Sequence, residues 1–402
     1  MTQTQTALII GGGIAGPAVA MALQKAGIEA RIYESRPEAA HGAGAFLTLA
    51  SNGIEALRVL DADGPARAAG FPTPSITLRS GTGKRLGETR TGGTLPDGTT
   101  SLTMKRAALY RILQDEAASR GITVERDKRL VSAEDGPDGV RAVFADGSDA
   151  SGDVLIGCDG VHSTVRGLID PHAPAPTYAG LLNTGGVARG VTGASAPGAY
   201  EMTFGKRAFF GYVQAPDREI WWFANVPHPR DPTCDAAIDR RAETWRPRLI
   251  DLYRDDAGPA LALIRRTAEF MALAPIHSLP HLPRWHRGRM VVVGDAAHAP
   301  SPSSGQGASL AIEDALVLAQ CLRDEPSATC AFARFEAVRR TRVERIVRWA
   351  ARMNNAKAPG PIGRRVRDLM LPAVLRLTAD SKAHREVYDH HITWREPGPA
   401  SA

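Results

Sequence analysis

The sequence predicts an α/β protein with three parts: a discontinuous domain on a parallel sheet, an inserted, mostly antiparallel β-sheet domain, and a C-terminal helical segment. The N-terminal stretch alternates strand, glycine turn, helix and strand. Residues 172–284 are rich in Gly, Pro and aromatic residues, with alternating segments at 208–214 and 219–226. Residues 331–357 have the pattern of a basic amphipathic helix. The predicted boundaries are 1–73, 101–171 and 285–325 for the first domain, 74–100 and 172–284 for the second, and 326–402 for the helical segment.

The first domain opens with a βαβ unit. Residues 7–10 form a short apolar strand, residues 17–26 have helical apolar spacing that stops at Gly27, and residues 29–33 resume as a strand. Such a unit implies a parallel strand pair with a right-handed crossover. Further along the chain we expect helices at 54–60, 105–119, 307–322 and within 366–377, and strands at 123–125, 130–133, 140–144, 153–156 and 289–293.

Composition limits the class of protein. The chain has 402 residues, 43% of them hydrophobic, and no apolar run approaches the roughly 20 residues that cross a bilayer. The N-terminus lacks the features of a signal peptide, and the four cysteines are scattered without a C-x-x-C pair, so we expect a cytoplasmic protein without a metal site. The net charge of +6 comes mainly from the C-terminal part, where no nucleic-acid motif accompanies it. We interpret this charge as a solvated helical face, not as a nucleic-acid interface.

A glycine turn with a distant carboxylate carries the first chemical signal. Gly11-x-Gly13-x-x-Gly16 lies between the first strand and the helix, and Glu34 ends the second strand. Glycine permits the tight bend, the close approach of a pyrophosphate and the packing of helix on strand, while the helix N-terminus attracts phosphate. Glu34 can accept both ribose hydroxyls and disfavours a 2′-phosphate. The unit therefore predicts a site for the AMP half of FAD or NAD, not of NADP.

Two later segments carry further signals. In residues 153–166 a strand enters a tight turn that presents Asp159 and Gly160. In residues 291–307 a strand ends at Gly294-Asp295, a proline-rich loop follows, and a glycine-flanked helix begins. A carboxylate at that strand end can bind a sugar-alcohol chain, and the helix N-terminus can face an anion.

Together and in this order, the three motifs resemble those of the para-hydroxybenzoate hydroxylase-like family, the class A FAD-dependent aromatic monooxygenases. Asp159-Gly160 resembles the family's DG motif and Gly294-Asp295 its GD motif. Residues 44–57 resemble the loop and helix after the second strand, and residues 104–113 resemble the R-x-x-L-x-x-x-L segment whose arginine reaches the flavin. The resemblance covers roughly residues 5–355.

The resemblance implies a Rossmann-type FAD-binding first domain and a substrate-binding second domain. NADH or NADPH would bind transiently and reduce FAD, O2 would form a flavin C4a-hydroperoxide, and this would hydroxylate an aromatic or polycyclic small molecule. It implies a monomer or homodimer and assigns no catalytic side chain, because the flavin performs the chemistry; Pro302 and Gly305 would border its ring. The residues that it assigns to the cofactor are Gly11, Gly13, Ala15, Gly16, Glu34, Arg36, Arg106, Asp159, Gly160, Gly294, Asp295, Pro302, Gly305, Gln306, Gly307 and Ala308.

The substrate pocket is expected between the flavin and the inserted sheet. Strand alternation places Phe210, Tyr212 and Trp222 on one face, which we take as the pocket face, although a shift of one residue would exchange the faces. Met202 and Phe204 are further candidates. The alternative for each aromatic side chain is plain core packing. An aromatic lining suits a sizeable hydrophobic or polycyclic substrate.

Other side chains and other activities remain open at this point. His298 is conceivable as a base, but a structural role is favoured; Arg189 or Arg207 could pair with an acidic substrate. His41 could approach the flavin ring, and the glycines beside it suit a mobile segment. The same fold could epoxidise an alkene or indole, oxidatively inactivate an antibiotic, or bind flavin without catalysis. A halogenase is disfavoured because the W-x-W-x-I-P segment is missing.

Overall fold

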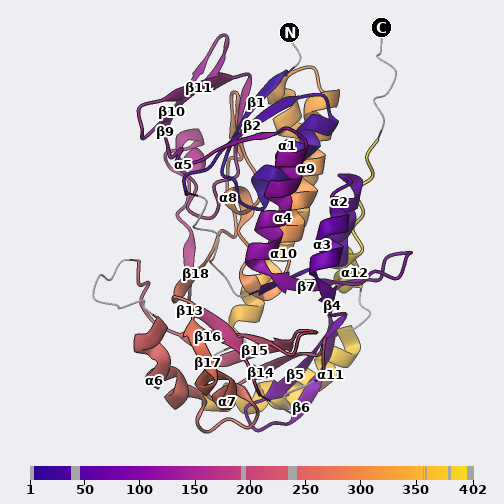
Figure 1. Cartoon of the computed structure of the whole chain (residues 1–402), viewed down its shortest axis with the longest axis vertical. Helices are drawn as coiled ribbons and strands as arrows, with labels where there is room; N and C mark the ends of the chain where they lie inside the picture. The colour runs from indigo at the N-terminus through magenta and orange to yellow at the C-terminus, as the bar shows by residue number, and fades with distance from the viewer. Residues whose placement is uncertain are drawn as a thin grey trace.

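The computed structural model describes residues 4–37, 46–191, 196–233, 242–355, 357, 360–378 and 382–395. Two lobes lie one above the other in Figure 1. The upper lobe holds a mostly parallel sheet with its helices, and the lower lobe holds a large, mostly antiparallel sheet. This arrangement confirms the predicted α/β class with an inserted β-sheet unit.

A six-stranded sheet forms the centre of the upper lobe, in the order β19-β20-β12-β1-β2-β8. Its strands are parallel except at the edge, where β19 runs against β20. The central strand is buried on both faces, as its continuous apolar run requires. The strands are β1 (Thr6–Ile10), β2 (Glu29–Tyr33), β8 (Thr123–Glu125), β12 (Val154–Gly157), β19 (His286–Arg287) and β20 (Met290–Val292).

Helices and two small sheets surround the central sheet. Helix α1 packs against α9, and α9 packs in turn against α10, which extends downward to the lower lobe (Figure 1). The helices are α1 (Ala15–Lys25), α2 (Ser51–Val59), α3 (Asp63–Ala69), α4 (Arg106–Ser119), α5 (Thr164–Ile169), α8 (Asp295–His298), α9 (Gly307–Asp324) and α10 (Ala328–Asn355). The small sheets are β9 (Leu130–Gly136) with β10 (Gly139–Phe144) and β11 (Asp149–Gly152), and β3 (Phe46–Leu49) with β7 (Leu102–Lys105) and β4 (Phe71–Pro72).

The lower lobe is an eight-stranded sheet in the order β17-β13-β16-β15-β14-β5-β6, with β18 paired to β13. Its paired strands run antiparallel except β14 and β5, which are parallel. Its strands are β5 (Ser75–Ser80), β6 (Arg85–Arg90), β13 (Thr177–Ala188), β14 (Tyr200–Phe204), β15 (Phe209–Gln214), β16 (Ile220–Pro227), β17 (Thr267–Phe270) and β18 (Ala274–Ser278). The helices beside it are α6 (Ala242–Tyr253), α7 (Ala260–Arg265) and α11 (Pro361–Thr378), whereas α12 (Lys382–Tyr388) lies against the upper lobe, where Val387 and Tyr388 join its core.

The prediction that Phe210, Tyr212 and Trp222 face the substrate pocket is wrong. Phe210, Tyr212 and Trp222 are buried in a core that this sheet forms with α6 and α7. The Phe210 ring stacks on Trp222 with centroids 5.3 Å apart, and the Trp222 indole N–H donates to Thr267 Oγ1 at 2.8 Å. Side chains alternate along a strand, so their neighbours point to the other face. The register differs from the prediction by one residue, which exchanges the two faces.

Replacing Trp222 by Ala should lower the free energy of unfolding by about 3–5 kcal/mol, because a fully buried ring would leave a cavity. Phe223→Ala is the matched control, since that ring borders an open cavity instead of the helix-backed core. Urea unfolding followed by circular dichroism measures both losses. An equal or larger loss for Phe223→Ala would show that the faces are assigned the wrong way round.

Candidate active site

A cavity of about 440 Å³ lies between the two lobes. It begins at the carboxyl ends of β1 and β12, where open α/β sheets bind their ligands. Its floor is the lower sheet, and residues beyond α10 complete its wall. The predicted residues that line it are Gly13, Ala15, Arg106, Gly160, Met202, Phe204, Asp295, Pro302, Gly305, Gly307 and Ala308.

The three motif glycines lack a side chain for different physical reasons. A Cβ on Gly11, whose φ is +107°, would lie 2.4 Å from the carbonyl oxygen of Cys158. A Cβ on Gly16 would lie 2.0 Å from the carbonyl oxygen of Gly11, so the fold itself excludes a side chain at both positions. At Gly13 the nearest atom is the Tyr110 hydroxyl at 3.4 Å, which is ordinary contact. The protein therefore tolerates a side chain at Gly13, and the free space there serves a ligand.

Glu34 lies against this turn at the end of β2. Its Oε2 accepts a hydrogen bond from the Gly12 N–H at 2.7 Å, and its Oε1 accepts one from the Arg36 N–H at 2.9 Å. These contacts hold the carboxylate beside the turn, as a ribose acceptor requires. Arg36 contributes its backbone here, and its side chain does not line the cavity.

Two opposite charges face the cavity from the starts of α8 and α4. Asp295 and Arg106 both line it. The surrounding protein raises the pKa of Asp295 through burial, and Arg106 opposes that rise. Arg106 also contacts the Tyr110 hydroxyl at 3.4 Å. Within the part of the chain that the structure describes, no hydrogen bond reaches the Asp295 carboxylate, which leaves it free to accept from a ligand.

Asp314 fixes the segment that carries Asp295. Its carboxylate accepts from the Gly294 N–H at 3.0 Å, from His298 Nε2 at 2.5 Å and from Arg339 Nε at 2.6 Å. Burial alone would raise the pKa of Asp314, but His298 and Arg339 outweigh it and lower that pKa. His298 is itself buried, so it is a structural residue and not a base facing substrate.

The loop before α9 closes the same end of the cavity. Pro302–Ser304 form a short 3-10 helix, and Gly305 follows with a φ of +62°, a conformation that favours glycine. The first amides of an α-helix lack intrahelical acceptors, so the N-terminus of α9 presents donors beside the cavity. Gln306 points inward, where its Oε1 accepts from Asn52 Nδ2 at 3.0 Å.

Asp159 has a structural role. Its Oδ2 accepts from the Thr164 N–H at 2.7 Å and from the Val165 N–H at 3.1 Å, which caps the N-terminus of α5. The other carboxylate oxygen has no partner among the described residues. Gly160, with a φ of +79°, lines the cavity next to it.

The far half of the cavity contains residues that the sequence analysis missed. Its wall is mostly aromatic, from Phe46, Phe209 and Phe223, together with the predicted Met202 and Phe204. Its polar members are Thr89, Arg90, Thr91, Asn183, Tyr200, Asn225 and Lys357. The strand alternation could have identified Phe209 and Phe223 with the other register. Nothing local in the sequence marks Lys357, because the amphipathic pattern predicted for residues 331–357 includes it only as one more basic residue, although α10 itself ends at Asn355.

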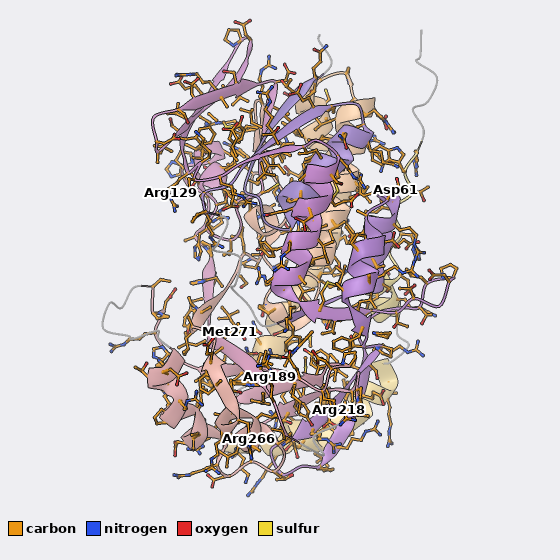
Figure 2. All side chains as sticks on the ribbon, viewed as in Figure 1. Asp61, Arg129, Arg189, Arg218, Arg266 and Met271 are labelled. Carbon is orange, nitrogen blue, oxygen red and sulfur yellow. The ribbon has the colours of Figure 1, made fainter. Side chains whose placement is uncertain are left out.

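Two predicted arginines lie outside the cavity wall. Arg189, labelled in the lower lobe in Figure 2, is 78% exposed at its side chain and pairs with Glu219. Arg207 pairs with Asp251 at 2.9 Å. Neither lines the cavity, so the hypothesis that they meet the substrate is not supported by their positions. His41 and the glycines beside it lie outside the described residues.

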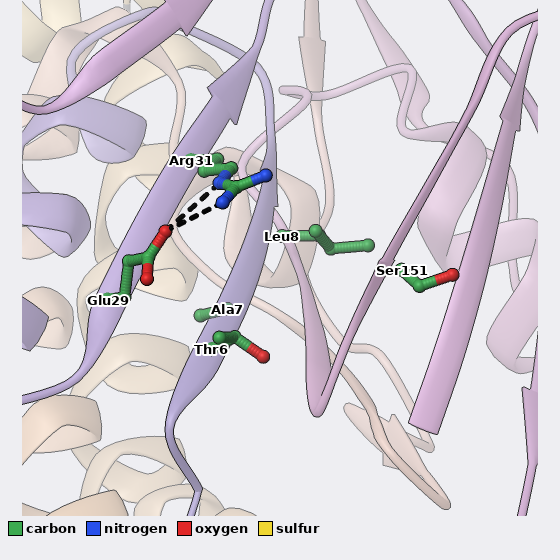
Figure 3. Close-up of a pocket in the computed structure, with 6 residues that line it drawn as sticks. All are labelled: Thr6, Ala7, Leu8, Glu29, Arg31 and Ser151. Carbon is green, nitrogen blue, oxygen red and sulfur yellow. Dashed lines mark hydrogen bonds and ion pairs between the residues drawn. The ribbon is translucent and has the colours of Figure 1, made fainter. Parts of the chain in front are cut away.

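A second pocket, shown in Figure 3, has a volume of only about 60 Å³. It lies at the amino ends of β1 and β2, where Arg31 and Glu29 form an exposed ion pair. That is the opposite end of the sheet from the large cavity and the wrong end for a dinucleotide. The described residues contain no group of three His, Cys, Asp or Glu side chains that could hold a metal ion. None of the helices in the described ranges has both the length and the apolar character to span a membrane.

A dinucleotide-type turn that opens into an aromatic cavity defines a nucleotide-cofactor oxidoreductase. The family model described as "FAD binding domain" matches residues 3–350. The aurachin C monooxygenase/isomerase of Stigmatella aurantiaca is 32% identical over 83% of this chain and 85% of its own. The FAD-dependent urate hydroxylase of Klebsiella pneumoniae is 32% identical over 85% and 87%. The crystal structure of Klebsiella pneumoniae HpxO with FAD and uric acid superposes with a TM-score of 0.82, at 26% identity over 94% of this chain and 97% of that one.

The chain therefore belongs to the FAD binding domain family, as a class A FAD-dependent aromatic monooxygenase. FAD is its cofactor, and NADH or NADPH is the electron donor typical of the family. The space at Gly13 and the unpartnered carboxylate of Asp295 fit that cofactor. The possibility of a flavin-binding protein without catalysis is set aside, because the relatives are named as monooxygenases and hydroxylases.

Replacing Arg339 by Met should lower the free energy of unfolding by about 3–5 kcal/mol, because two buried carboxylates lose a partner. The pKa values of Asp314 and Glu313 are lowered in the folded state, so this stabilisation is complete above the usual 3.8 and 4.5 and fades as the pH falls below them. Urea unfolding at neutral and acidic pH measures the effect. Arg334→Met, on the exposed side of the same helix, is the control and should change little.

Proposed function

We propose that this enzyme hydroxylates a ring carbon of an aromatic or polycyclic small molecule, with NADH or NADPH and O2 as co-substrates. The observation that carries the proposal is the continuity of the cavity. One space joins the residues of the nucleotide-binding motifs to an aromatic wall on the lower sheet. A planar ring in this space would stack or pack edge-on against that wall.

We infer that each group of motif residues binds a different part of the cofactor. The turn of Gly11, Gly13 and Gly16 with Glu34 suits the ADP part, because it offers room, amides and a ribose acceptor. Asp295 suits the hydroxyls of the ribityl chain, since its carboxylate faces the cavity without a partner. Arg106 and Gly160 border the stretch between these ends, and Asp159 would support the cofactor from beside Gly160, where it caps α5.

The same proposal assigns the flavin ring to the segment from Pro302 to Ala308. A reduced flavin is negatively charged, and the amide donors at the start of α9 suit that charge. When bound, FAD supplies the electron transfer and the activation of O2 that no side chain can provide. The protein contributes orientation of the substrate and exclusion of water.

The aromatic wall supports a hydrophobic ring as the substrate. Phe46 and Phe223 lie edge-on with centroids 5.9 Å apart, and Phe209 lies 6.1 Å from Phe223. These rings exclude water from the side of the cavity that faces away from the motif residues. The relative named FAD-dependent urate hydroxylase supports a ring compound as the substrate, although urate is more polar than this wall suggests.

Replacing Gly13 by Val should yield a folded but colourless protein. The Cβ position at Gly13 has only ordinary contact with Tyr110, so the fold tolerates a side chain, whereas the pyrophosphate would not. Visible absorbance after purification and after addition of FAD measures the cofactor, and circular dichroism measures the fold. Gly16→Val, where the fold itself is blocked, should instead lose both. A yellow Gly13→Val protein with full flavin content would contradict this assignment of the turn.

The proposed reaction predicts oxygen-dependent oxidation of NADH or NADPH that accelerates with a suitable aromatic compound. The expected product carries one oxygen atom from O2, which mass spectrometry after a reaction under labelled oxygen detects. Hydrogen peroxide as the only product across a panel of phenols, quinolones and oxopurines would contradict ring hydroxylation. Loss of visible flavin would instead contradict the cofactor site.

A further inference from the structure

The aromatic half of the cavity contains one connected polar group. Lys357 Nζ donates to Asn225 Oδ1 at 2.6 Å, and Asn225 Nδ2 donates to Asn183 Oδ1 at 3.0 Å. The three residues come from distant parts of the chain: the turn beyond α10, strand β16 and strand β13. All three line the cavity. The group therefore belongs to the cavity wall and is available to whatever occupies the space.

Lys357 is unusual because it is buried and has no charged partner. Only 7% of the residue is exposed, and its Nζ lies 4.4 Å from the centroid of the Phe209 ring. Among the described residues no carboxylate lies within ion-pair distance of it. An ammonium group has three donor hydrogens, and one amide oxygen accepts only one of them. Burial of a cation without a counter-charge costs free energy. A lysine at this buried position therefore points to a role other than stabilising the fold.

The charges around the cavity do not supply that counter-charge. Arg90 and Arg106 are cations, and Asp295 faces Arg106 on the cofactor side. The other wall residues that could carry a negative charge are the phenols Tyr110, Tyr200 and Tyr388, and burial raises the pKa of Tyr200 and Tyr388, which opposes their ionisation. Burial lowers the pKa of Lys357 to about 7. An anion that entered the cavity would therefore raise the pKa of Lys357 and stabilise its charged form.

Hydrogen bonds through Asn354 also fix the position of Lys357 relative to the loop before α9. Its backbone N–H donates to the carbonyl oxygen of Asn354 at 3.0 Å. The Asn354 side chain accepts hydrogen bonds from Ser301 and Ser303, which precede and form the 3-10 helix beside the proposed flavin ring. A group bound to Lys357 is thereby held at a defined place relative to that loop.

We propose that Lys357 is the specificity-determining residue that binds an anionic oxygen, a carboxylate or an ionised ring hydroxyl, on the aromatic substrate. Asn225 and Asn183 orient its amine. This proposal rests on the function proposed above and deepens it, because it names acidic aromatic molecules as the substrate class. Lys357 lies beside the Phe209 ring on the side of the cavity away from the motif residues, so this contact also fixes which end of the molecule points away from the flavin.

The test uses the FAD-replete enzyme and four probes of one shape: 6-hydroxy-2-naphthoate, its methyl ester, 6-methoxy-2-naphthoate, and methyl 6-methoxy-2-naphthoate. The change in flavin absorbance gives a Kd for each. We expect the wild-type enzyme to prefer an acidic probe over the fully blocked one. The ester and the ether separate a hydroxyl from a carboxylate as the group recognised.

Lys357→Met should raise the Kd of the acidic probes by about tenfold or more, since a hydrogen bond to a charged group is lost. The Kd of the fully blocked probe should stay nearly unchanged. Lys357→Arg should retain most of the preference. Binding of the carboxylate should weaken as the pH rises through about 7, where Lys357 loses its proton, and Lys357→Arg should lack this dependence. Lys84→Met, an exposed lysine in the turn between β5 and β6, is the matched control.

An unchanged ratio of acidic to blocked binding in Lys357→Met would overturn the proposal. So would the absence of any spectral change with the acidic probes at millimolar concentration in wild-type enzyme that contains FAD. Failure of the proposed function has a different signature, because the purified protein would then lack flavin absorbance or oxidise no NADH or NADPH with any aromatic compound.

Discussion

Two neighbouring buried carboxylates on α9 hold the cofactor end of this enzyme together. Asp314 and Glu313 are completely buried, and Arg339 and Arg342 of α10 neutralise them. Removal of one partner from such a network leaves an uncompensated charge inside the protein. Through Gly294, Asp314 also fixes the turn between β20 and α8, where Asp295 begins the helix. The ion network thus sets the position of Asp295, the residue proposed to bind the ribityl chain.

Helix α10 connects this network to the substrate half of the cavity. Its middle supplies the buried arginines, and its end supplies Asn354 and the turn to Lys357. Arg342 also donates to the backbone carbonyl oxygens of Glu386 and Val387, next to the cavity residue Tyr388. The C-terminal segment therefore builds part of the site. Its basic character is only partly a solvated face, because two of its arginines serve as buried counter-ions.

The cofactor half could be predicted from the sequence because its determinants are local. A glycine turn requires glycine wherever backbone or ligand comes close, and the βαβ pattern surrounds it within a short stretch of chain. Strand β2 and strand β8 have the predicted bounds, and α4 differs by one residue. Strand β11, with the sequence Asp-Ala-Ser-Gly, was not predicted, since its propensity is poor and only pairing with β10 makes it a strand.

The residues of the substrate half could not be predicted correctly from the sequence, for a physical reason. Strands β15 and β16 are apolar on both faces, because one face packs on α6 and α7 while the other borders the cavity. Alternation gives the two sets of side chains but cannot say which set faces the helices. No local sequence pattern identifies Lys357 as a site residue, since its place in the site depends on contact with Asn225, 132 positions away in sequence.

This division between the halves also explains how relatives of similar sequence can act on different molecules. At Gly11 and Gly16 a side chain would collide with the backbone, so the fold itself restricts those positions. Met202, Phe204 and Phe223 are only partly buried and border the open cavity, where another side chain would not collide with the backbone. Replacement there costs little stability but changes the shape and charge presented to the substrate. Enzymes of this kind can therefore keep one cofactor site and vary the wall opposite it, and in this chain the most distinctive feature of that wall is a buried cation.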